Sequence, residues 1–180
     1  MIGHERFLIW LKGVYTLALT CRQWGDSGKG KFVDLFALIW AEVILRGTGG
    51  GNAGHTIVIN NKTYILHIIP SGILHDKDGK INAIGRGVAF DPSIACGELD
   101  VLDKEGVSYD NLMIALNAKL VLPQHLVMDR IKESDPASGK IGTTGRGIGP
   151  LYRDHVDRVG LIVNDLLNID VFVAKLRRNL

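Results

Sequence analysis

A glycine-rich stretch that follows an apolar run and precedes a helical pattern constrains the fold of this chain more than any other feature. The stretch Gln23–Lys31 contains three glycines and two lysines, so main-chain N–H groups can approach an anion closely while two ammonium groups add charge. Val14–Cys21 before it is continuous and has no polar face, which is typical of a strand buried in a parallel sheet. Phe32–Trp40 after it repeats apolar residues at helical spacing. This order of strand, glycine loop and helix predicts a phosphate-binding loop.

The carboxylate of Asp26 distinguishes this loop from an ordinary phosphate loop. The spacing G-x-x-x-x-G-K at 25–31 matches the Walker pattern, but Phe32 stands where Ser or Thr would hold magnesium. A carboxylate repels phosphates, so Asp26 is useful there only if it holds a magnesium ion or abstracts a proton. Phe32, and the lack of an aspartate at the end of an apolar strand near Glu42–Arg46, disfavour a generic P-loop NTPase or kinase.

Two further glycine-rich segments extend the same interpretation. Gly47–Thr56 follows the expected strand Glu42–Arg46 as a second loop, which can present main-chain groups, the Asn52 amide and the His55 imidazole to a ligand. The position of His55 among glycines and just before a strand favours an acid or base. Gly142–Pro150 places two hydroxyls and an arginine between glycines, which suits phosphate or carboxylate binding. The alternative is that the 22 glycines only form turns, but their clustering favours anion-binding loops.

The remaining patterns predict an α/β fold similar to P-loop NTPases, with a mostly parallel central sheet and flanking helices. Asn60-Asn61 predicts a hairpin between strands at 57–60 and 63–68. Asp91-Pro92-Ser93 predicts a helix that begins there and continues to about Lys104. We expect His67 in the core and His75 at the surface. Further strands are expected at 81–84, 112–116 and 120–122, and further helices at 124–133, 152–158 and 170–180.

The composition fits a globular, cytoplasmic protein. A net charge of +2 gives no reason to expect nucleic acid or a membrane surface as a partner, and no apolar run approaches the length of a membrane span. Cys21 and Cys96 lack metal or redox spacing, which favours reduced thiols. The N-terminus faintly resembles a secretory signal, but cleavage there would remove the strand that supports the glycine loop. We therefore expect 1–13 to be an extension and 14–180 to form one nucleotide-binding domain.

Four motifs, in order, resemble those of adenylosuccinate synthetase. They are Gln-Trp-Gly-Asp-x-Gly-Lys-Gly-Lys at 23–31, Asn-Ala-Gly-His-Thr at 52–56, His-Ile-Ile-Pro-Ser-Gly-Ile-Leu at 67–74 and Gly-Thr-Thr-Gly-Arg-Gly-Ile-Gly-Pro-x-Tyr at 142–152. The resemblance extends from about Val14 to Leu180. It implies GTP-dependent ligation of IMP and L-aspartate to adenylosuccinate through 6-phosphoryl-IMP, in de novo AMP biosynthesis, with Mg²⁺ as cofactor and GTP as co-substrate.

The resemblance also implies roles for individual residues. Asp26 matches the residue that takes the N1 proton of IMP and ligates magnesium, and the carbonyl of Gly54 matches a second magnesium ligand. His55 matches an acid that hydrogen-bonds the γ-phosphate, and Lys29 matches a lysine that stabilises the transferring phosphoryl group. Arg158 matches an arginine that reaches the neighbouring subunit's site, which implies a homodimer. The implied GTP contacts are Gly25, Asp26, Ser27, Gly28, Lys29, Gly30, Lys31, Gly54, His55 and Thr56, and the implied IMP contacts are Asp26, Ser27, Gly28, Lys29, Asn52, Ala53, Gly54, His55, Thr144 and Arg158.

The chain departs from the family pattern in residues and in length. His155 replaces a lysine and so exchanges a fixed charge for one that titrates near neutrality. The family's chains are much longer, and their guanine-recognising motif and aspartate-binding loop have no counterpart here. A sheet shortened in this way is expected to leave an apolar face and an unpaired edge. Two functions stay open, a portion of the synthetase or a non-catalytic nucleotide-binding module. The other departures are Cys21 and Arg22 for a Gly and a small residue, Ser27 for a Glu, Gly51 for a His, and Arg86 for an Asn.

Overall fold

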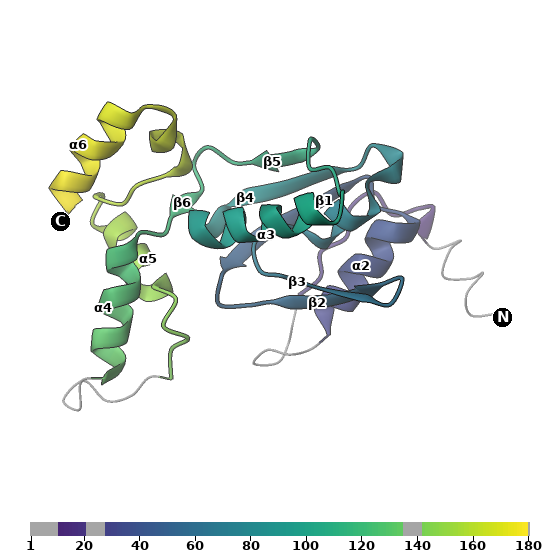
Figure 1. The fold of residues 1–180 in the computed structure, drawn as a ribbon, viewed down its shortest axis with the longest axis horizontal. Helices are drawn as coiled ribbons and strands as arrows, with labels where there is room; N and C mark the ends of the chain where they lie inside the picture. The colour runs from purple at the N-terminus through teal and green to yellow at the C-terminus, as the bar shows by residue number, and fades with distance from the viewer. Residues whose placement is uncertain (1–10, 21–27, 135–141, 180) are drawn as a thin grey trace.

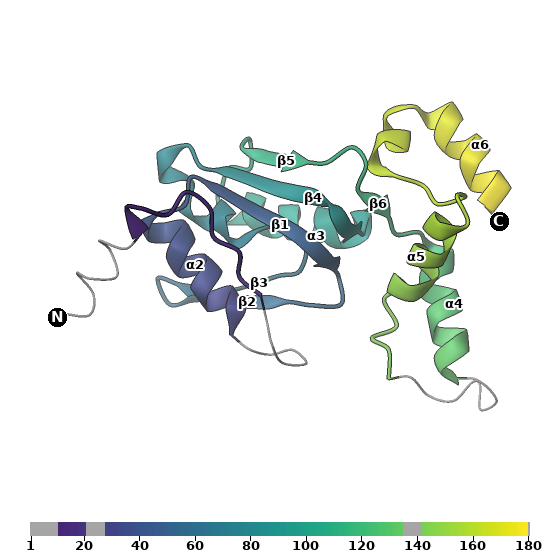
Figure 2. The same cartoon turned by 180° about the vertical axis from the view of Figure 1, so that it is seen from behind.

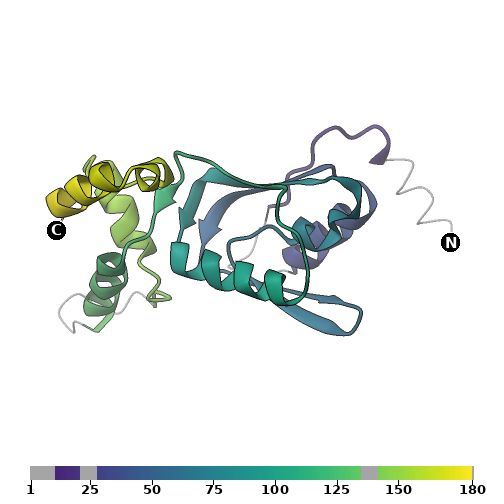
Figure 3. The same ribbon diagram turned by 45° about the horizontal axis from the view of Figure 1, so that its top comes forward.

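A parallel sheet, called sheet A here, forms the centre of the fold in the computed structural model, which describes residues 11–20, 28–134 and 142–179 (Figure 1). Its strands are β1 (Val43–Gly50), β4 (Ile81–Phe90), β5 (Leu112–Ile114) and β6 (Lys119–Leu120), and β4 pairs in parallel with the other three. The helix α3 (Pro92–Lys104) lies along one face of the sheet (Figure 3). The predicted α/β class with a parallel sheet and flanking helices is confirmed.

The helix α3 begins and ends where its sequence signals indicate. Asp91 Oδ1 accepts the main-chain N–H groups of Ser93 (3.0 Å) and Ile94 (3.3 Å), which have no partner inside the helix. Pro92 takes the first helical position, where its missing N–H group has no consequence. The predicted helix from Asp91 to about Lys104 is confirmed.

A separate antiparallel hairpin consists of β2 (His55–Ile59) and β3 (Lys62–Leu66). Its two turn residues have positive φ angles, 50° at Asn60 and 64° at Asn61. A two-residue hairpin turn needs this conformation, and asparagine adopts it more readily than most residues. The hairpin predicted over these two asparagines is confirmed.

The other helices form two groups. The helix α2 (Lys29–Ile39) packs on the hairpin and on the 3-10 segment η1 (Ser71–Asp78), as Figure 2 shows from behind. The second group lies beyond the β6 end of sheet A (Figure 1). It consists of α4 (Pro123–Ser134), α5 (Ile148–Val156), the 3-10 segment η2 (Val163–Leu167) and α6 (Ile169–Asn179).

Strands β1 and β4 continue through glycines that the sequence predicted to lie in loops. Gly47 and its neighbours to Gly50 belong to β1, so the second loop is shorter than expected. The strand predicted to end at Ile84 likewise continues to Phe90. A Cβ atom on Gly87 would lie 2.3 Å from the carbonyl oxygen of Gly47, so these glycines permit a close approach of two backbones.

The prediction of a buried first strand at Val14–Cys21 is wrong for the residues that the structure describes there. Residues 14–20 form no strand, and the side chain of Tyr15 is 99% exposed. An apolar run becomes a strand only where a neighbouring strand supplies hydrogen-bond partners. Within the described part of the chain, β1 pairs with β4 alone.

One face of sheet A is covered, and the opposite face is exposed where β1, β4 and β5 lie side by side. Ile84, Val88 and Phe90 belong to the largest core cluster, together with Ala95 of α3. On the opposite face, Leu45, Ala83 and Met113 stand side by side in register, and Leu45 and Met113 are more than half exposed. The expected apolar face is therefore present on this open sheet.

In the part of the chain that the structure describes, the helices are too short or too polar to cross a lipid bilayer.

Candidate functional site

The first turn of α2 lies directly against the first residue of β2. Gly28 has a φ angle of 70°, and α2 begins immediately after it, at Lys29. A Cβ atom on Gly30 would lie 2.7 Å from Cβ of His55, so this approach requires glycine. The structure therefore brings two predicted site segments together, and the positive end of the helix lies beside an imidazole. The predicted site residues Gly25, Asp26 and Ser27 lie outside the described residues.

The guanidinium of Arg46 lies against the ring of His55. Arg46 Nη1 is 3.0 Å from His55 Nε2 and 3.5 Å from His55 Nδ1. Burial, followed by the charge of Arg46, lowers the pKa of His55 to about 4. His55 is therefore a neutral imidazole at pH 7, and it becomes an acid only when an anion nearby raises its pKa.

We expect His55 to titrate near pH 4 in the folded chain, against about 6.5 when unfolded. The unfolded chain then binds more protons between these values, so His55 lowers the stability of the fold as pH falls from about 6.5 to about 4. Arg46→Gln removes the neighbouring positive charge and is expected to raise the pKa of His55. NMR titration of the His55 ring protons measures this pKa in the unsubstituted chain and in Arg46→Gln. A midpoint near 6.5 in the unsubstituted chain would contradict this electrostatic account.

Arg46 also holds the second loop, and the sequence analysis did not identify it as a site residue. Its Nη2 group donates to the carbonyl oxygens of Gly50 (3.3 Å) and Ala53 (3.5 Å). Asn52, Ala53 and Gly54 are exposed in the short loop that remains after β1. The sequence did contain a signal for Arg46, because an arginine at the end of a predicted strand and just before a glycine run can reach the main chain of the loop that follows.

The third glycine-rich segment meets the second through α5. A Cβ atom on Gly50 would lie 3.1 Å from Ile148 Cδ1 and 2.8 Å from the carbonyl oxygen of Ala89. Gly30 approaches His55 in the same way, so the second segment contacts both the first and the third.

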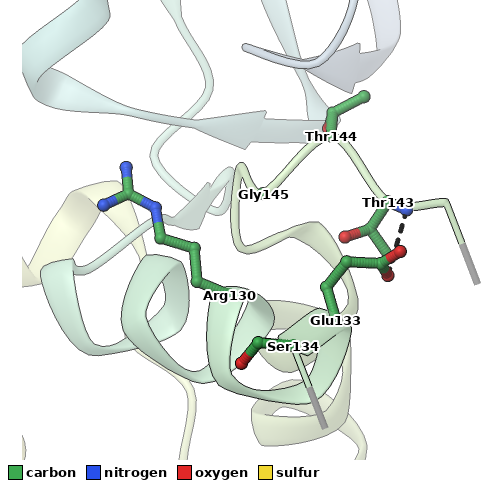
Figure 4. Close-up of a pocket in the computed structure, with 6 residues that line it drawn as sticks. All are labelled: Arg130, Glu133, Ser134, Thr143, Thr144 and Gly145. Carbon is green, nitrogen blue, oxygen red and sulfur yellow. Dashed lines mark hydrogen bonds between the residues drawn. The ribbon is translucent and has the colours of Figure 1, made fainter. Parts of the chain in front are cut away.

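The start of the third segment forms an open pocket with α4. The pocket has a volume of about 630 Å³ (Figure 4). The carboxylate of Glu133 accepts the main-chain N–H groups of Gly142 (2.8 Å) and Thr143 (3.3 Å), so the loop can present adjacent donors to an anion. Thr144, a predicted IMP contact, is exposed in this pocket. The lining residues are Arg130, Glu133, Ser134, Thr143, Thr144 and Gly145.

The C-terminal turn of α5 and the residues after it include one family departure and one site prediction. Arg158 is exposed and has a φ angle of 61°, which is uncommon for a residue other than glycine. In the last turn of α5, His155 Nε2 donates to the carbonyl oxygen of Leu161 (3.2 Å), and burial lowers the pKa of this histidine. Burial therefore favours the neutral imidazole at a position where the resemblance implies a charged lysine.

Two other histidines, His67 and His75, also differ from expectation. His75 lies in a turn but is largely buried, because its Nε2 atom lies 2.7 Å from Asp34 Oδ1 on α2. The side chain of His67 is 33% exposed and lies against Gly54, where a Cβ atom would be 3.2 Å from its Nε2 atom. The described residues contain no group of three or more His, Cys, Asp or Glu side chains arranged to hold a metal ion.

Glycine-rich segments beside a parallel sheet, one of them at the start of a helix, are typical of α/β proteins that bind phosphate groups. The profile of adenylosuccinate synthetase matches residues 18–180. The chain belongs to the adenylosuccinate synthetase family.

Relatives of known name agree with this assignment. The adenylosuccinate synthetase of Clostridium kluyveri is 52% identical over 160 residues, which cover 88% of this chain and 37% of that protein. The synthetase of Geobacillus kaustophilus is 52% identical over 158 residues, which cover 88% of this chain and 36% of that protein. The chain thus spans little more than a third of the length of the curated relatives it matches.

Solved structures show the same fold. The fully ligated adenylosuccinate synthetase of Plasmodium falciparum aligns with a TM-score of 0.74 and 33% identity, over 87% of this chain and 36% of that one. The succinoaminodeoxyadenylate synthetase of cyanophage S-2L, bound to dGMP and dATP, aligns with a TM-score of 0.62 and 23% identity, over 81% of this chain and 39% of that one. The second likeness concerns the fold alone.

Proposed function

We propose that the chain is the phosphate- and IMP-binding portion of an adenylosuccinate synthetase, which joins IMP to L-aspartate at the expense of GTP in AMP biosynthesis. The observation that supports this most directly is the contact between Gly30 and His55, where a Cβ atom would lie only 2.7 Å from His55 Cβ. This contact brings the start of α2, which follows Asp26 in the sequence, against the second loop. A C–N bond must form at a carbonyl carbon whose oxygen leaves poorly, so GTP first phosphorylates that oxygen and aspartate then displaces phosphate.

The chain's residues have separate tasks in this proposal. Asp26 takes the N1 proton of IMP, which increases the negative charge on the 6-oxygen. Lys29, in the first turn of α2, stabilises the charge of the transferring phosphoryl group. His55 donates a hydrogen bond to the γ-phosphate, whose negative charge raises the pKa of the imidazole.

Magnesium fits the donors that this site offers. Gly54 is exposed in the loop before β2, so its carbonyl oxygen is available to a cation. A backbone carbonyl and the Asp26 carboxylate are hard oxygen ligands, which suit Mg²⁺. When bound, the ion would neutralise phosphate charge. We propose that Asp26 and Gly54 hold it.

The proposal extends to assembly and location. The exposed position of Arg158 after α5 allows it to reach a second subunit, which supports a homodimer in which each site receives this arginine. We place the enzyme in the cytoplasm, where IMP, GTP and aspartate are metabolised, and we assign residues 14–180 to a single nucleotide-binding domain.

A non-catalytic nucleotide-binding module is the second candidate. Such a module would bind IMP or GTP through the same loops without forming adenylosuccinate, so binding and turnover assays together separate the two candidates.

Lys29→Ala is expected to weaken binding of GTP with magnesium by about tenfold or more, because a hydrogen bond from a charged donor to phosphate is lost. Isothermal titration calorimetry on the 180-residue chain measures this. Lys104→Ala, an exposed lysine in the last turn of α3, is the matched control and should leave the affinity unchanged. Absence of heat with IMP, GTP and magnesium in the unsubstituted chain would refute nucleotide binding altogether.

A further inference from the structure

Arg158 has a backbone conformation that is unusual for its residue type. It lies just after α5 and has a φ angle of 61°. Its N–H group donates to the carbonyl oxygen of His155 (3.2 Å). The next N–H group, that of Val159, donates to the carbonyl oxygen of Asp154 (2.9 Å). These two hydrogen bonds form a Schellman motif, in which the left-handed residue is usually glycine. The left-handed conformation is unfavourable for a residue with a Cβ atom, so contacts around Arg158 must maintain it.

The side-chain amide of Asn179 contacts the chain on both sides of Arg158. Asn179 is the last residue of α6, and its Nδ2 group donates to Asp154 Oδ2 (3.1 Å) and to the carbonyl oxygen of Val159 (3.1 Å). Its Oδ1 atom accepts a hydrogen bond from Gln124 Nε2 (3.0 Å) on α4. One amide group therefore joins the last turn of α5, the residue after Arg158 and α4.

The carboxylate of Asp154 is itself held by a buried histidine. His125 is completely buried, and its Nδ1 atom accepts the N–H group of Leu122 (3.0 Å). A main-chain N–H group can only donate, so the ring proton lies on Nε2, which donates to Asp154 Oδ2 at 2.9 Å. The same oxygen accepts a hydrogen bond from Asn179, so this network is anchored in the interior of the fold.

The residues that follow Arg158 are held as well. The N–H group of Gly160 donates to the carbonyl oxygen of Asp154 (2.9 Å). A Cβ atom on Gly160 would lie 2.8 Å from His155 Nε2, so the chain passes directly against that ring. Arg158 itself is exposed. The network therefore fixes the main chain of a residue whose side chain makes its contribution at the surface.

We propose that Asn179 and Asp154 are positioning residues for Arg158, which keep its backbone left-handed so that the guanidinium leaves the surface at a defined place and meets an anion held by a second copy of the chain. The inference rests on the proposed function, which assigns Arg158 to the neighbouring subunit's site. The other described residues that have a positive φ angle and are not glycine, Asn60 and Asn61, suit a hairpin turn. A preset backbone reduces the entropy that is lost when the arginine binds.

Two substitutions of Arg158 test its backbone conformation. Arg158→Gly removes the Cβ atom and should lower the equilibrium constant for unfolding by about fivefold or more. Arg158→Ala keeps the Cβ atom and should leave this constant within about twofold of its original value. Urea denaturation of the 180-residue chain measures both. Equal stability of the two variants would contradict the left-handed conformation on which the proposal depends.

Substitution of Asn179 tests the network by NMR. A positive φ angle produces a strong NOE between the amide proton and the Hα proton of the same residue. We expect this NOE at Arg158 in the unsubstituted chain, and a weak one in Asn179→Ala. Amide hydrogen exchange at Val159 and Gly160 should accelerate about tenfold or more in this variant. Arg178→Ala removes an exposed side chain from the same turn of α6 and is the matched control, with no change in either measurement.

Calorimetric titration with IMP separates positioning from a structural role. Asn179→Ala should weaken IMP binding by about threefold or more in the unsubstituted chain and should have no further effect in Arg158→Ala, because the residue that it positions is then absent. An equal loss in both backgrounds would show that Asn179 only supports the fold.

An unchanged NOE at Arg158 in Asn179→Ala would also overturn the proposal. If that variant does not fold, Asn179→Asp decides the matter, because a carboxylate cannot donate to Asp154 or to the carbonyl oxygen of Val159. The NMR and urea measurements need no nucleotide. A failed IMP titration would therefore refute the proposed function, while these two measurements would still decide whether the network positions Arg158.

Discussion

Asp26→Asn is expected to lower adenylosuccinate formation by about a hundredfold to ten-thousandfold, the usual contribution of a general acid or base. An asparagine cannot take the N1 proton of IMP and is a weaker ligand for magnesium than a carboxylate. The assay needs a longer polypeptide, such as this chain joined to the remaining part of the Geobacillus kaustophilus synthetase, which is 52% identical over the shared region. The rate of IMP-, GTP- and aspartate-dependent product formation is the measurement.

Two controls accompany that measurement. Asp100→Asn in the same fusion replaces an exposed carboxylate far from the site segments and should keep full activity. The isolated 180-residue chain is expected to form no product, because about two thirds of the length of the relatives lies outside the region that matches these residues. Full activity of Asp26→Asn in the folded fusion would remove proton abstraction from the proposed mechanism.

Gly147→Ala is expected to destabilise the fold by about 2–5 kcal/mol, from a left-handed backbone and from overpacking together. Gly147 has a φ angle of 74°, and a Cβ atom there would lie 2.8 Å from the main-chain carbon of His125. His125 cannot move aside, because it is fully buried and its Nε2 atom lies 2.9 Å from Asp154 Oδ2. Its Nδ1 atom also accepts the N–H of Leu122 at 3.0 Å.

Urea denaturation of Gly147→Ala and Gly145→Ala separates the cost of the left-handed backbone from the cost of overpacking against His125. Gly145 has a similar φ angle of 65°, but the nearest atom to its added Cβ would be Arg130 Cγ at 3.7 Å, on a flexible side chain. Gly145→Ala should therefore lose only the backbone part, about 1–2 kcal/mol. Equal losses in both variants would show that the contact with His125 is unimportant.

Features governed by neighbours in sequence were predictable. Asp91 with Pro92 located the start of α3, and Asn60 with Asn61 located the hairpin turn. The start of α2 was predictable for a related reason, since a glycine before a helical pattern can adopt the positive φ angle seen at Gly28. In each case the signal lies within a few residues and acts through φ, ψ and hydrogen bonds of the local chain.

Features governed by distant partners were not predictable from local patterns. The apolar run at Val14–Thr20 forms no strand, because apolarity does not supply a neighbouring strand for its hydrogen bonds. His75 appeared to belong to a surface turn, but Asp34 lies 41 positions earlier in the chain and only 2.7 Å away. The contacts of Arg46 with the His55 ring and with the carbonyl oxygens of the second loop were not predictable for the same reason, because they depend on how the loop folds back on the strand.

The sequence by itself determined the family and the α/β class, because these depend on glycines, lysines and capping residues whose effects are local. Only the tertiary structure decided the state of the site. The neutral form of His55 depends on burial and on Arg46, whose guanidinium lies against the ring. Charge and burial follow from distances between atoms that folding alone brings together.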